Sequence, residues 1–340
     1  MIHHGEDAKD ASILPTYLQD AYTLAQQFCQ LLAHRARGTG FIETLLLRRV
    51  GSTLIAGRKT AEGMLGIRTE SDGYEEEELE DAEVSEIFKQ MTADERNLLS
   101  RFVNLLKDHE EDDPKFERVR EILEEQGWID RGCIIFSQYY DSISWLAEKL
   151  KDIYPNEMIG IYAGGPRSGV FQNGIYRRIP REDLKARVRK GEVRLLLGTD
   201  AASEGLNLQA LGSLINLDLP WNPTRLEQRK GRIQRIGQIY DDVWIYNMRY
   251  GGSVEDRVHD LLSQRFSSIY KMFGQIPDTL EDVWVKVAMN KIDDAKRTIE
   301  AVPPQNPFEI RYNMIKPINW ESRAVVLDDV ERRRYLLKGW

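Results

Sequence analysis

Residues 193–238 lay out four elements in a fixed order: a strand, a small polar loop, a second strand and an arginine-rich helix. The apolar run at 193–197 indicates a buried strand, and a second apolar run begins at residue 214 and leads directly into the helix. Proteins built from alternating strands and helices bind their ligands in loops at the carboxyl ends of the strands. The layout therefore favours a nucleotide-binding α/β lobe.

The helix expected at 223–235 carries an unusual density of guanidinium groups. Helical spacing places three of them on one face and a fourth one turn further on: Arg225, Arg229, Arg232 and Arg235. Planar guanidinium groups match phosphate oxygens, and arginines that reach a transferring phosphoryl group stabilise its developing charge. The alternative is a solvated basic face, against which the glycines at 231 and 237 argue.

Strands and helices alternate through the middle of the chain, which predicts a parallel sheet with helices on both faces. Strands are expected at 133–137, 158–162, 193–198, 213–217 and 242–247. Helices are expected at 113–126, 141–152, 180–190 and 223–235, with a longer one from Ser253 to about residue 273.

The sequence before the α/β region is helical. Leucine and alanine recur at helical spacing over 12–65, with a break near 38–40, and an acid-rich connection follows at 66–90. A helix is expected at 92–108, where Thr92 and Glu95 have the spacing of a capping box. After residue 277 the chain is expected to be helical and then irregular.

Composition limits the classes of protein and of site. The 340 residues include 41% hydrophobic residues, enough for a substantial core, and two cysteines and five histidines that form no metal-binding pattern. No apolar run reaches membrane-spanning length, and the first ten residues do not form a signal peptide. We therefore expect a cytoplasmic protein with no membrane partner and no metal ligands of its own.

Charge is unevenly distributed over a chain whose formal net charge is −8. An acidic tract at 72–83 fits a solvated linker or a mask over a basic groove, whereas residues 167–194 are rich in arginine and lysine. A localised basic strip is what contact with a phosphate backbone requires, even on an acidic protein.

Four sequence motifs resemble, in order, those of superfamily-two helicases: IIFSQ at 134–138, GTDAASEGLNLQ at 198–209, DLPWNP at 218–223 and EQRKGRIQRIGQ at 227–238. The last two are similar to the Swi/Snf-type double-stranded DNA translocases, and the bacterial RNA-polymerase-recycling and phage-defence branches look most alike. The resemblance covers about 113–263 and implies a RecA-like C-terminal lobe. Residues 41–60 also resemble the segment that joins the two motor lobes in this family.

A complete motor of this family also needs a P-loop and an acidic pair for magnesium. The stretch at 51–60 departs from the P-loop spacing and follows a helical pattern. We therefore expect the second lobe alone, as an excised fragment, a truncated gene or one half of a split motor. The resemblance implies ATP as cofactor, Mg²⁺ held by the missing first lobe, and a P-loop-bearing first lobe as partner in cis or in trans.

Three domains are expected: a helical inter-lobe segment with an acidic linker at 1–111, a RecA-like helicase C-terminal domain at 112–275, and a helical or irregular extension at 276–340.

The resemblance assigns roles to residues of the arginine helix. Arg232 and Arg235 match the arginine fingers that reach the γ-phosphate across the lobe interface, and the alternative is salt bridges to local acids. Gln228 and Arg229 are expected to position either the motif or the nucleotide.

The loop after residue 198 couples DNA to nucleotide in the family. The expected nucleotide-binding residues are Asp200, Gly205 and Asn207, and the expected DNA contacts are Thr199 and Ser203. Glu204 stands where the family often has glycine, and the whole loop also fits a tight turn with side-chain capping.

Two further places are expected to contact DNA. Ser137 and Gln138 end a strand at the ligand edge, where strand-end capping is the alternative. The insertion at 166–180 interleaves aromatic and basic residues, including Arg177 and Arg178, as nucleic-acid loops do. Its alternative is a packed hairpin around residues 173–174.

The resulting hypothesis is the second motor lobe of an ATP-dependent double-stranded DNA translocase, inactive alone. A non-catalytic DNA-binding or regulatory module is the alternative, and an unrelated scaffold or nucleotide-binding protein is a third possibility.

Overall fold

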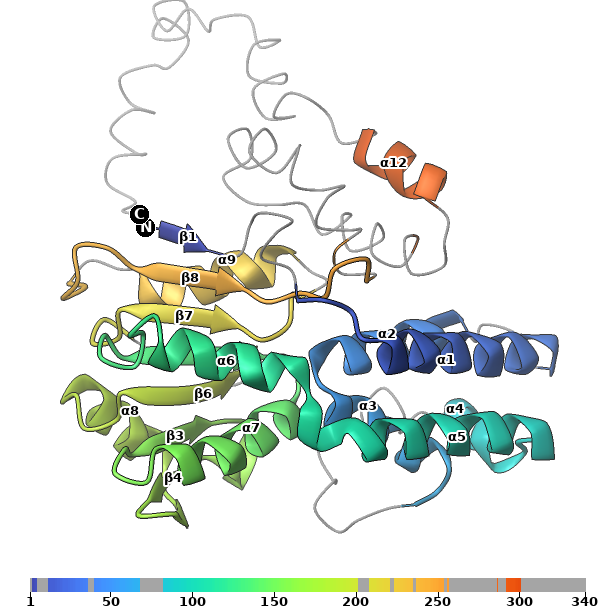
Figure 1. Ribbon diagram of the computed structural model, residues 1–340, viewed down its shortest axis with the longest axis horizontal. Helices are drawn as coiled ribbons and strands as arrows, with labels where there is room; N and C mark the ends of the chain where they lie inside the picture. Colours follow the sequence, from blue (N-terminus) through green and yellow to red (C-terminus); the bar gives the residue numbers. More distant parts are fainter. Residues whose placement is uncertain are drawn as a thin grey trace, which may run out of the picture.

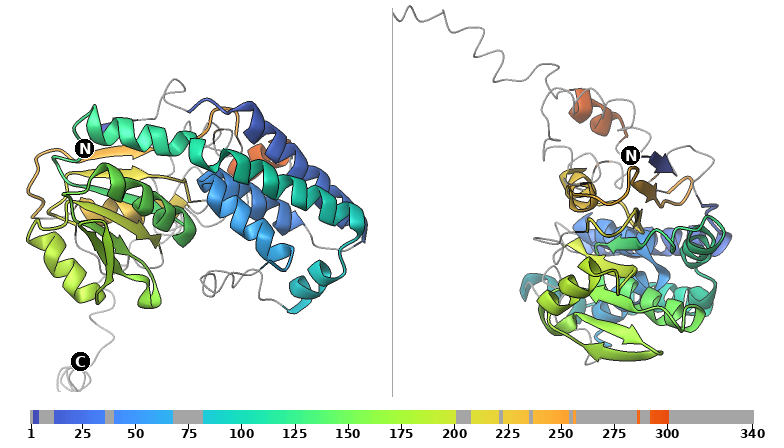
Figure 2. Two further views of the ribbon diagram at one scale, coloured as in Figure 1. Left: turned by 60° about the horizontal axis from the view of Figure 1, so that its bottom comes forward. Right: turned by 90° about the vertical axis from the view of Figure 1, so that its left-hand side faces the viewer.

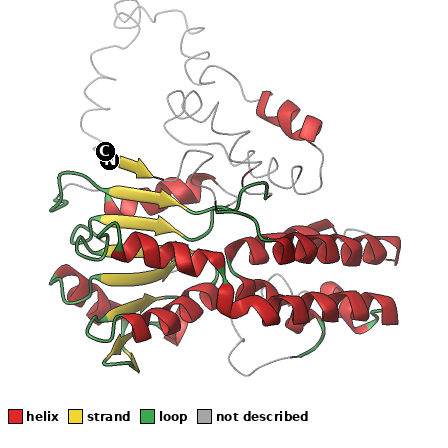
Figure 3. Cartoon of the chain, in the orientation of Figure 1, coloured by secondary structure: helices red, strands yellow, loops and turns green. Residues whose placement is uncertain are grey.

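The structure is a computed structural model in which one sheet carries a group of helices at its carboxyl edge (Figure 1). It describes residues 2–4, 12–35, 40–67, 82–200, 208–220, 223–234, 237–253, 256, 286 and 292–300. In Figure 3 the strands lie together at one end of the molecule and the long helices extend from the other.

The sheet has eight strands in the order β1-β8-β7-β2-β6-β3-β4-β5. Their bounds are β1 Ile2–His4, β2 Cys133–Ser137, β3 Ile159–Tyr162, β4 Gly169–Gln172, β5 Ile175–Arg178, β6 Leu195–Thr199, β7 Ser213–Asn216 and β8 Trp244–Asn247. All pairings from β1 to β3 are parallel, and β4 and β5 add an antiparallel hairpin. The five predicted strands are all present, which confirms the predicted α/β class.

Two pairs of helices cover the sheet on opposite faces (Figure 2). They are α6 Pro114–Glu124 and α7 Tyr140–Ile153 on one face, and α8 Arg181–Arg189 and α9 Pro223–Ile233 on the other. Alternate residues of the central strand point to the two faces: Ile135 packs with α6 and α7, whereas Ile134 and Phe136 pack with α8 and α9. This confirms the prediction that helices cover both faces of the parallel sheet.

The helical segment forms a second hydrophobic core beside the sheet, which Leu219 and Tyr250 of the α/β region join. Its helices are α1 Thr16–Arg35, α2 Gly40–Ser52, α3 Leu54–Met64, α4 Ala82–Lys89 and α5 Ala93–His109. The predicted capping box is confirmed, since Thr92 accepts from the Glu95 N–H and the Glu95 carboxylate accepts from the Thr92 N–H. One further helix, α12 Ile292–Glu300, is described in the C-terminal part.

A buried aspartate joins the two cores. Asp113 caps α6 by accepting from the Lys115 N–H at 2.9 Å, and its second oxygen accepts from the Leu54 N–H at the start of α3, also at 2.9 Å. The Tyr250 hydroxyl, after β8, donates to the same carboxylate at 3.1 Å. The start of α3, the start of α6 and the end of the sheet are therefore fixed to one side chain.

Three elements differ from the sequence expectations. Helix α4 lies inside the predicted acid-rich connection, and β1 adds an edge strand that no pattern indicated. The predicted single helical run to residue 65 is broken at Thr53, which caps α3. Among the described helices, none has both the length and the apolar character needed to cross a membrane.

Candidate nucleotide and nucleic-acid site

Helix α9 brings the sequence-predicted arginines to the carboxyl end of the sheet, but in three different environments. Arg225 is exposed, Arg232 is partly buried, and Arg229 has 1% of its surface exposed. The predicted common face of the helix is therefore divided between solvent and the protein interior, because Leu226 packs on the helical segment and Ile233 packs on the sheet.

The Arg229 guanidinium uses all five of its N–H groups inside the protein. It donates to both Asp200 oxygens at 2.5 and 2.8 Å, and to the Asp218 carboxylate at 3.2 Å. The remaining two bonds go to the Asn216 side-chain oxygen at 3.0 Å and to the Asp218 backbone carbonyl at 2.9 Å. A guanidinium has five N–H donors, so none is left for a ligand.

The electrostatics of this pair follow from its burial. Burial opposes the charge on Asp218, but Arg229 and the hydroxyls of Ser137 and Ser52 outweigh it and hold the pKa of that carboxyl below its ordinary value. Burial likewise opposes the charge on Arg229, but the carboxylates of Asp200 and Asp218 raise its pKa. Both groups are therefore charged at neutral pH.

Arg229 and Asp200 thus form a bidentate ion pair. Of the two roles expected for Arg229, positioning the motif and positioning the nucleotide, the geometry favours the first. Asp200 was expected to contact the nucleotide, yet both of its carboxylate oxygens are bonded to Arg229. In the structure Asp200 links the end of β6 to α9, and its contact with a nucleotide stays a prediction.

Arg232 is arranged in the opposite way. Its Nε is buried and makes no hydrogen bond with any part of the chain that the structure describes. Its backbone carbonyl accepts from the Leu208 N–H at 3.3 Å, which fixes the end of α9 against the chain leading into β7. Gln228 is exposed on the same helix. Gln238 donates to the carbonyls of Leu211 and Ile233, so its side chain closes the helix end.

The predicted DNA-binding side chains at the carboxyl ends of β2 and β6 differ in exposure, and the prediction for Gln138 is not tested. Ser137 and Thr199 are buried, and the Ser137 hydroxyl donates to Asp218 and accepts from the Tyr139 N–H at 3.0 Å. Gln138 is partly buried and accepts from Arg48 of α2 at 3.0 Å. The structure therefore gives Ser137 the strand-end capping role in place of a DNA contact, because the chain's own helix α2 covers this edge.

Four predicted site residues fall outside the described residues. They are Ser203, Gly205 and Asn207 in the loop after β6, and Arg235 just beyond α9. The predictions made for them stand as predictions.

The predicted insertion is the β4–β5 hairpin, the outermost part of the sheet. Asn173 and Gly174 have φ values of 51° and 73°, and positive φ at both central residues is what a type I′ turn requires. Phe171 is buried under Lys151, whereas Arg177 and Arg178 are exposed and Ile175 leaves 61% of its surface in solvent. The segment is therefore a hairpin, as the alternative interpretation held. Its outer strand, β5, nevertheless exposes Arg177 and Arg178 to solvent.

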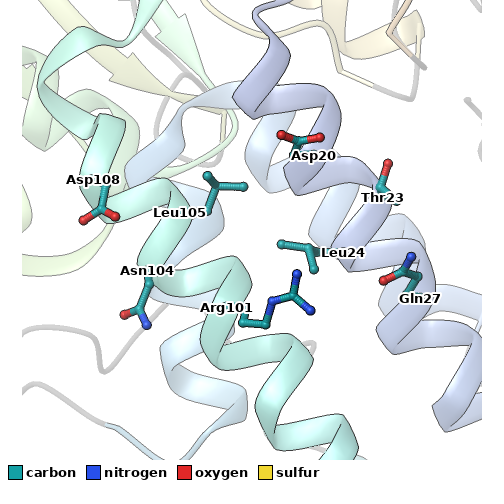
Figure 4. Close-up of a pocket in the computed structure, with 8 residues that line it drawn as sticks. All are labelled: Asp20, Thr23, Leu24, Gln27, Arg101, Asn104, Leu105 and Asp108. Carbon is teal, nitrogen blue, oxygen red and sulfur yellow. The ribbon is translucent and has the colours of Figure 1, made fainter.

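Two other features are separate from the motif residues. A polar groove of about 560 Å³ lies between α1 and α5 (Figure 4), lined by Asp20, Thr23, Leu24, Gln27, Arg101, Asn104, Leu105 and Asp108. It contains none of the sequence-predicted site residues. Among the described residues no group of His, Cys, Asp or Glu side chains is placed to hold a metal ion. The assignment of Mg²⁺ to a first lobe remains a prediction.

Sequence reasoning missed the hub of this site. Asp218 stands in a motif that was recognised, but its contacts with Ser52 of α2 and with Arg229 were not foreseen. A buried serine at the end of a helix has no signature in a single sequence. The acidic residue at the end of a strand, just before an arginine-rich helix, was the available signal.

The comparisons with known proteins agree with the motifs. Residues 114–237 match the family of the helicase conserved C-terminal domain. The uncharacterised ATP-dependent helicase YqhH of Bacillus subtilis is 35% identical over 166 residues, which are 49% of this chain and 27% of YqhH. The RNA polymerase-associated protein RapA of Vibrio atlanticus is 32% identical over 122 residues, 31% of this chain and 12% of RapA. The chain thus matches about a quarter or less of each relative's length.

Solved structures also resemble the chain at low identity. The C-terminal part of the Fun30 ATPase domain has a TM-score of 0.45 at 14% identity, over 84% of this chain and 96% of that one. The Hef helicase domain of Pyrococcus furiosus has a TM-score of 0.44 at 15% identity, over 75% of this chain and 56% of that one.

The residues matched by the family model include the strand ends and α9, with Asp200, Asp218, Arg229 and Arg232 in the motifs described above. Residues 114–237 thus carry a helicase conserved C-terminal domain, and the chain is similar in sequence to the ATP-dependent helicase YqhH and to RapA.

Proposed function

We propose that this chain is the second motor lobe of an ATP-dependent translocase that moves along double-stranded DNA. The observation that carries the proposal is Arg232, whose buried Nε makes no hydrogen bond within the described chain, while Arg229 one turn earlier is fully bonded. The Arg232 side chain is only partly buried and its guanidinium is not held by a carboxylate of the described chain, so it is suited to an anion supplied from outside. The γ-phosphate of ATP, held by a P-loop on a first lobe, has that chemistry.

The chemical role of Arg232 is to stabilise charge. As the γ-phosphoryl group transfers to water, negative charge spreads over its oxygens, and a guanidinium placed against them lowers the barrier. ATP supplies the phosphoryl group, and this chain supplies Arg232 and, by the motif, Arg235. The clamp of Arg229 between Asp200 and Asp218 keeps α9 in place while the lobes close.

The DNA-binding part of the proposal rests on the hairpin. Arg177 and Arg178 are consecutive exposed residues of β5 at the edge of the sheet, and α8, which follows β5 in the chain, carries further basic side chains. Such groups bind phosphates without reading bases. Changes in the grip on the backbone, coupled to lobe closure, would drive movement along the duplex.

The test is DNA-stimulated ATP hydrolysis by this chain, alone and together with the P-loop lobe of the same motor in cis or in trans. Arg232→Ala is expected to lower kcat by about 10³-fold or more. Arg225→Ala, which removes an exposed arginine from the same helix, is the matched control and is expected to hydrolyse ATP at the wild-type rate.

Hydrolysis by Arg232→Ala at the wild-type rate would overturn the arginine-finger role. DNA binding without hydrolysis in any mixture would instead favour the alternative, a non-catalytic DNA-binding module. That alternative has an observation in its favour, since the hairpin arginines are exposed independently of any first lobe.

A further inference from the structure

We infer that Ser52 of α2 is a positioning residue for the arginine helix: through Asp218 and Arg229 it fixes α9 and therefore sets where Arg232 lies. The inference rests on the proposed role of Arg232 for its catalytic consequence, but its structural part concerns this chain alone. Ser52 lies outside residues 114–237, the part that matches the helicase C-terminal family. The helical segment would thus contribute to the site without touching a ligand.

The first link joins α2 to the end of β7. The Ser52 hydroxyl is completely buried and donates to Asp218 Oδ2 at 2.6 Å. A carboxylate accepts but does not donate, so the direction of this hydrogen bond is fixed. A bond from a neutral donor to a buried charged acceptor is among the stronger ones in proteins.

The second link also joins α2 to the segment after β7, through the residues that precede Ser52 and Asp218. Lys115, also completely buried, donates from Nζ to the Gly51 carbonyl at the end of α2 and to the Leu217 carbonyl at 2.6 Å. Two consecutive residues of α2 are therefore tied to two consecutive residues after β7. Such a pair of ties resists rotation as well as separation of the two segments.

The third link runs from Asp218 to α9. Asp218 accepts from Arg229 through its carboxylate and through its backbone carbonyl, and the side chain is shared with Ser52. Moving Asp218 therefore moves the acceptors of two Arg229 bonds. Arg229 and Arg232 lie one turn apart on one helix, so a shift of the first is transmitted to the second.

A chain of hydroxyls orients Ser52 itself. Its single proton goes to Asp218, so the 2.8 Å contact with the Ser142 hydroxyl requires Ser142 to donate. Ser142 is in turn 2.8 Å from the hydroxyl of Thr53, which then donates to Ser142. Hydrogen bonds are thus donated from Thr53 to Ser142, from Ser142 to Ser52, and from Ser52 to the charged carboxylate of Asp218. Each hydrogen bond in such a series polarises the next.

The first arm of the test measures amide hydrogen exchange in the full chain. Ser52→Ala is expected to speed exchange in α9 on the order of tenfold, as loss of one charge-assisted bond would, while α8 on the same face of the sheet stays at the wild-type rate. Ser213→Ala is the matched control, because Ser213 is a buried serine at the other end of β7 that donates to the Gly132 carbonyl and makes no bond to α9. It is expected to leave α9 unchanged.

The second arm measures ATP hydrolysis by the complete motor. Misplacement of a catalytic group by about 1 Å costs on the order of 10²-fold, so Ser52→Ala is expected to lower kcat by ten- to a hundredfold with an unchanged KM for ATP. Ser52→Thr, which restores the hydroxyl, is expected to recover slow exchange in α9 and most of the lost kcat.

The outcomes separate this inference from the proposed function. Equal acceleration of exchange in α8 and α9 by Ser52→Ala, or none in either, overturns the positioning role whatever Arg232 does. Faster exchange confined to α9, together with wild-type hydrolysis by Arg232→Ala, supports the positioning of the helix and overturns the arginine finger.

Discussion

The junction at the carboxyl ends of β2 and β7 and the β4–β5 hairpin at the edge of the same sheet use arginine in opposite ways. In the junction, Arg229 is buried and every N–H is bonded to the protein. In the hairpin, Arg177 and Arg178 lie in solvent on an edge strand. A buried charge contributes only if its partners stay in place, whereas an exposed charge contributes little to folding and is free to bind. The comparison separates arginines that hold the lobe together from arginines that face a partner.

The largest expected effect is that of Arg229→Met. The methionine keeps much of the apolar volume but leaves Asp200 and Asp218 with a buried, uncompensated charge, so the free energy of unfolding should fall by about 3–5 kcal/mol. Urea unfolding at neutral pH measures it. Arg225→Met, on the exposed side of α9, is the control and should stay within about 0.5 kcal/mol of wild type. If both variants lost a similar, small amount of unfolding free energy, the buried arginine would not stabilise the fold more than the exposed one does.

A smaller effect should appear in the pH dependence of Asp218. Its folded pKa lies below its ordinary value, so the charged form adds stability above the unfolded pKa of about 3.9, and that stability is lost as the pH falls through the folded pKa. Asp218→Asn should therefore cost about 1.5–3 kcal/mol at pH 7 and progressively less below pH 4. Unfolding of both proteins across this range measures the difference. A difference that does not change with pH would contradict the charged pair.

The smallest effect on stability is expected in the hairpin. Arg177→Gln with Arg178→Gln should change the free energy of unfolding by less than about 0.5 kcal/mol, because both side chains are exposed. DNA binding should weaken for all sequences alike, and the slope of log affinity against log salt should become shallower by about 1.8, or about 0.9 for each lost phosphate contact.

The control for the hairpin is a second double variant with the same loss of charge. Arg96→Gln with Arg101→Gln removes two exposed arginines from α5, in the helical segment. An equal change of salt slope in both double variants would mean that net charge, and not the hairpin, accounts for the binding.

Much of the fold was predictable because local signals and tertiary structure agree. The strand predicted at 133–137 coincides with β2, and the capping box at Thr92 starts α5 as expected. Strand β1 was not predictable, since three residues acquire strand structure only by pairing with β8. Helix α4 lies where acidic composition indicated a linker, and its apolar residue Phe88 becomes decisive only when it packs on the helical core.

The sequence predicted which motifs form the site, but not which role each of their residues has. Helical spacing placed Arg225, Arg229 and Arg232 together, but spacing does not reveal which of them meets the acids at the ends of β6 and β7. Ser137 was expected to face a ligand because it ends a strand at the usual edge. That reasoning failed because α2, distant in sequence, covers this part of the edge.

The buried ammonium of Lys115 has a consequence for where this lobe can be divided. Its acceptors include carbonyls at residues 51 and 217, one before the region of family similarity and one deep inside it. A polypeptide that began at residue 114 would keep the lysine and lose one of those acceptors, together with the helix that excludes water from it. We therefore expect the helical segment and the lobe it covers to unfold together, although the sequence similarity begins between them.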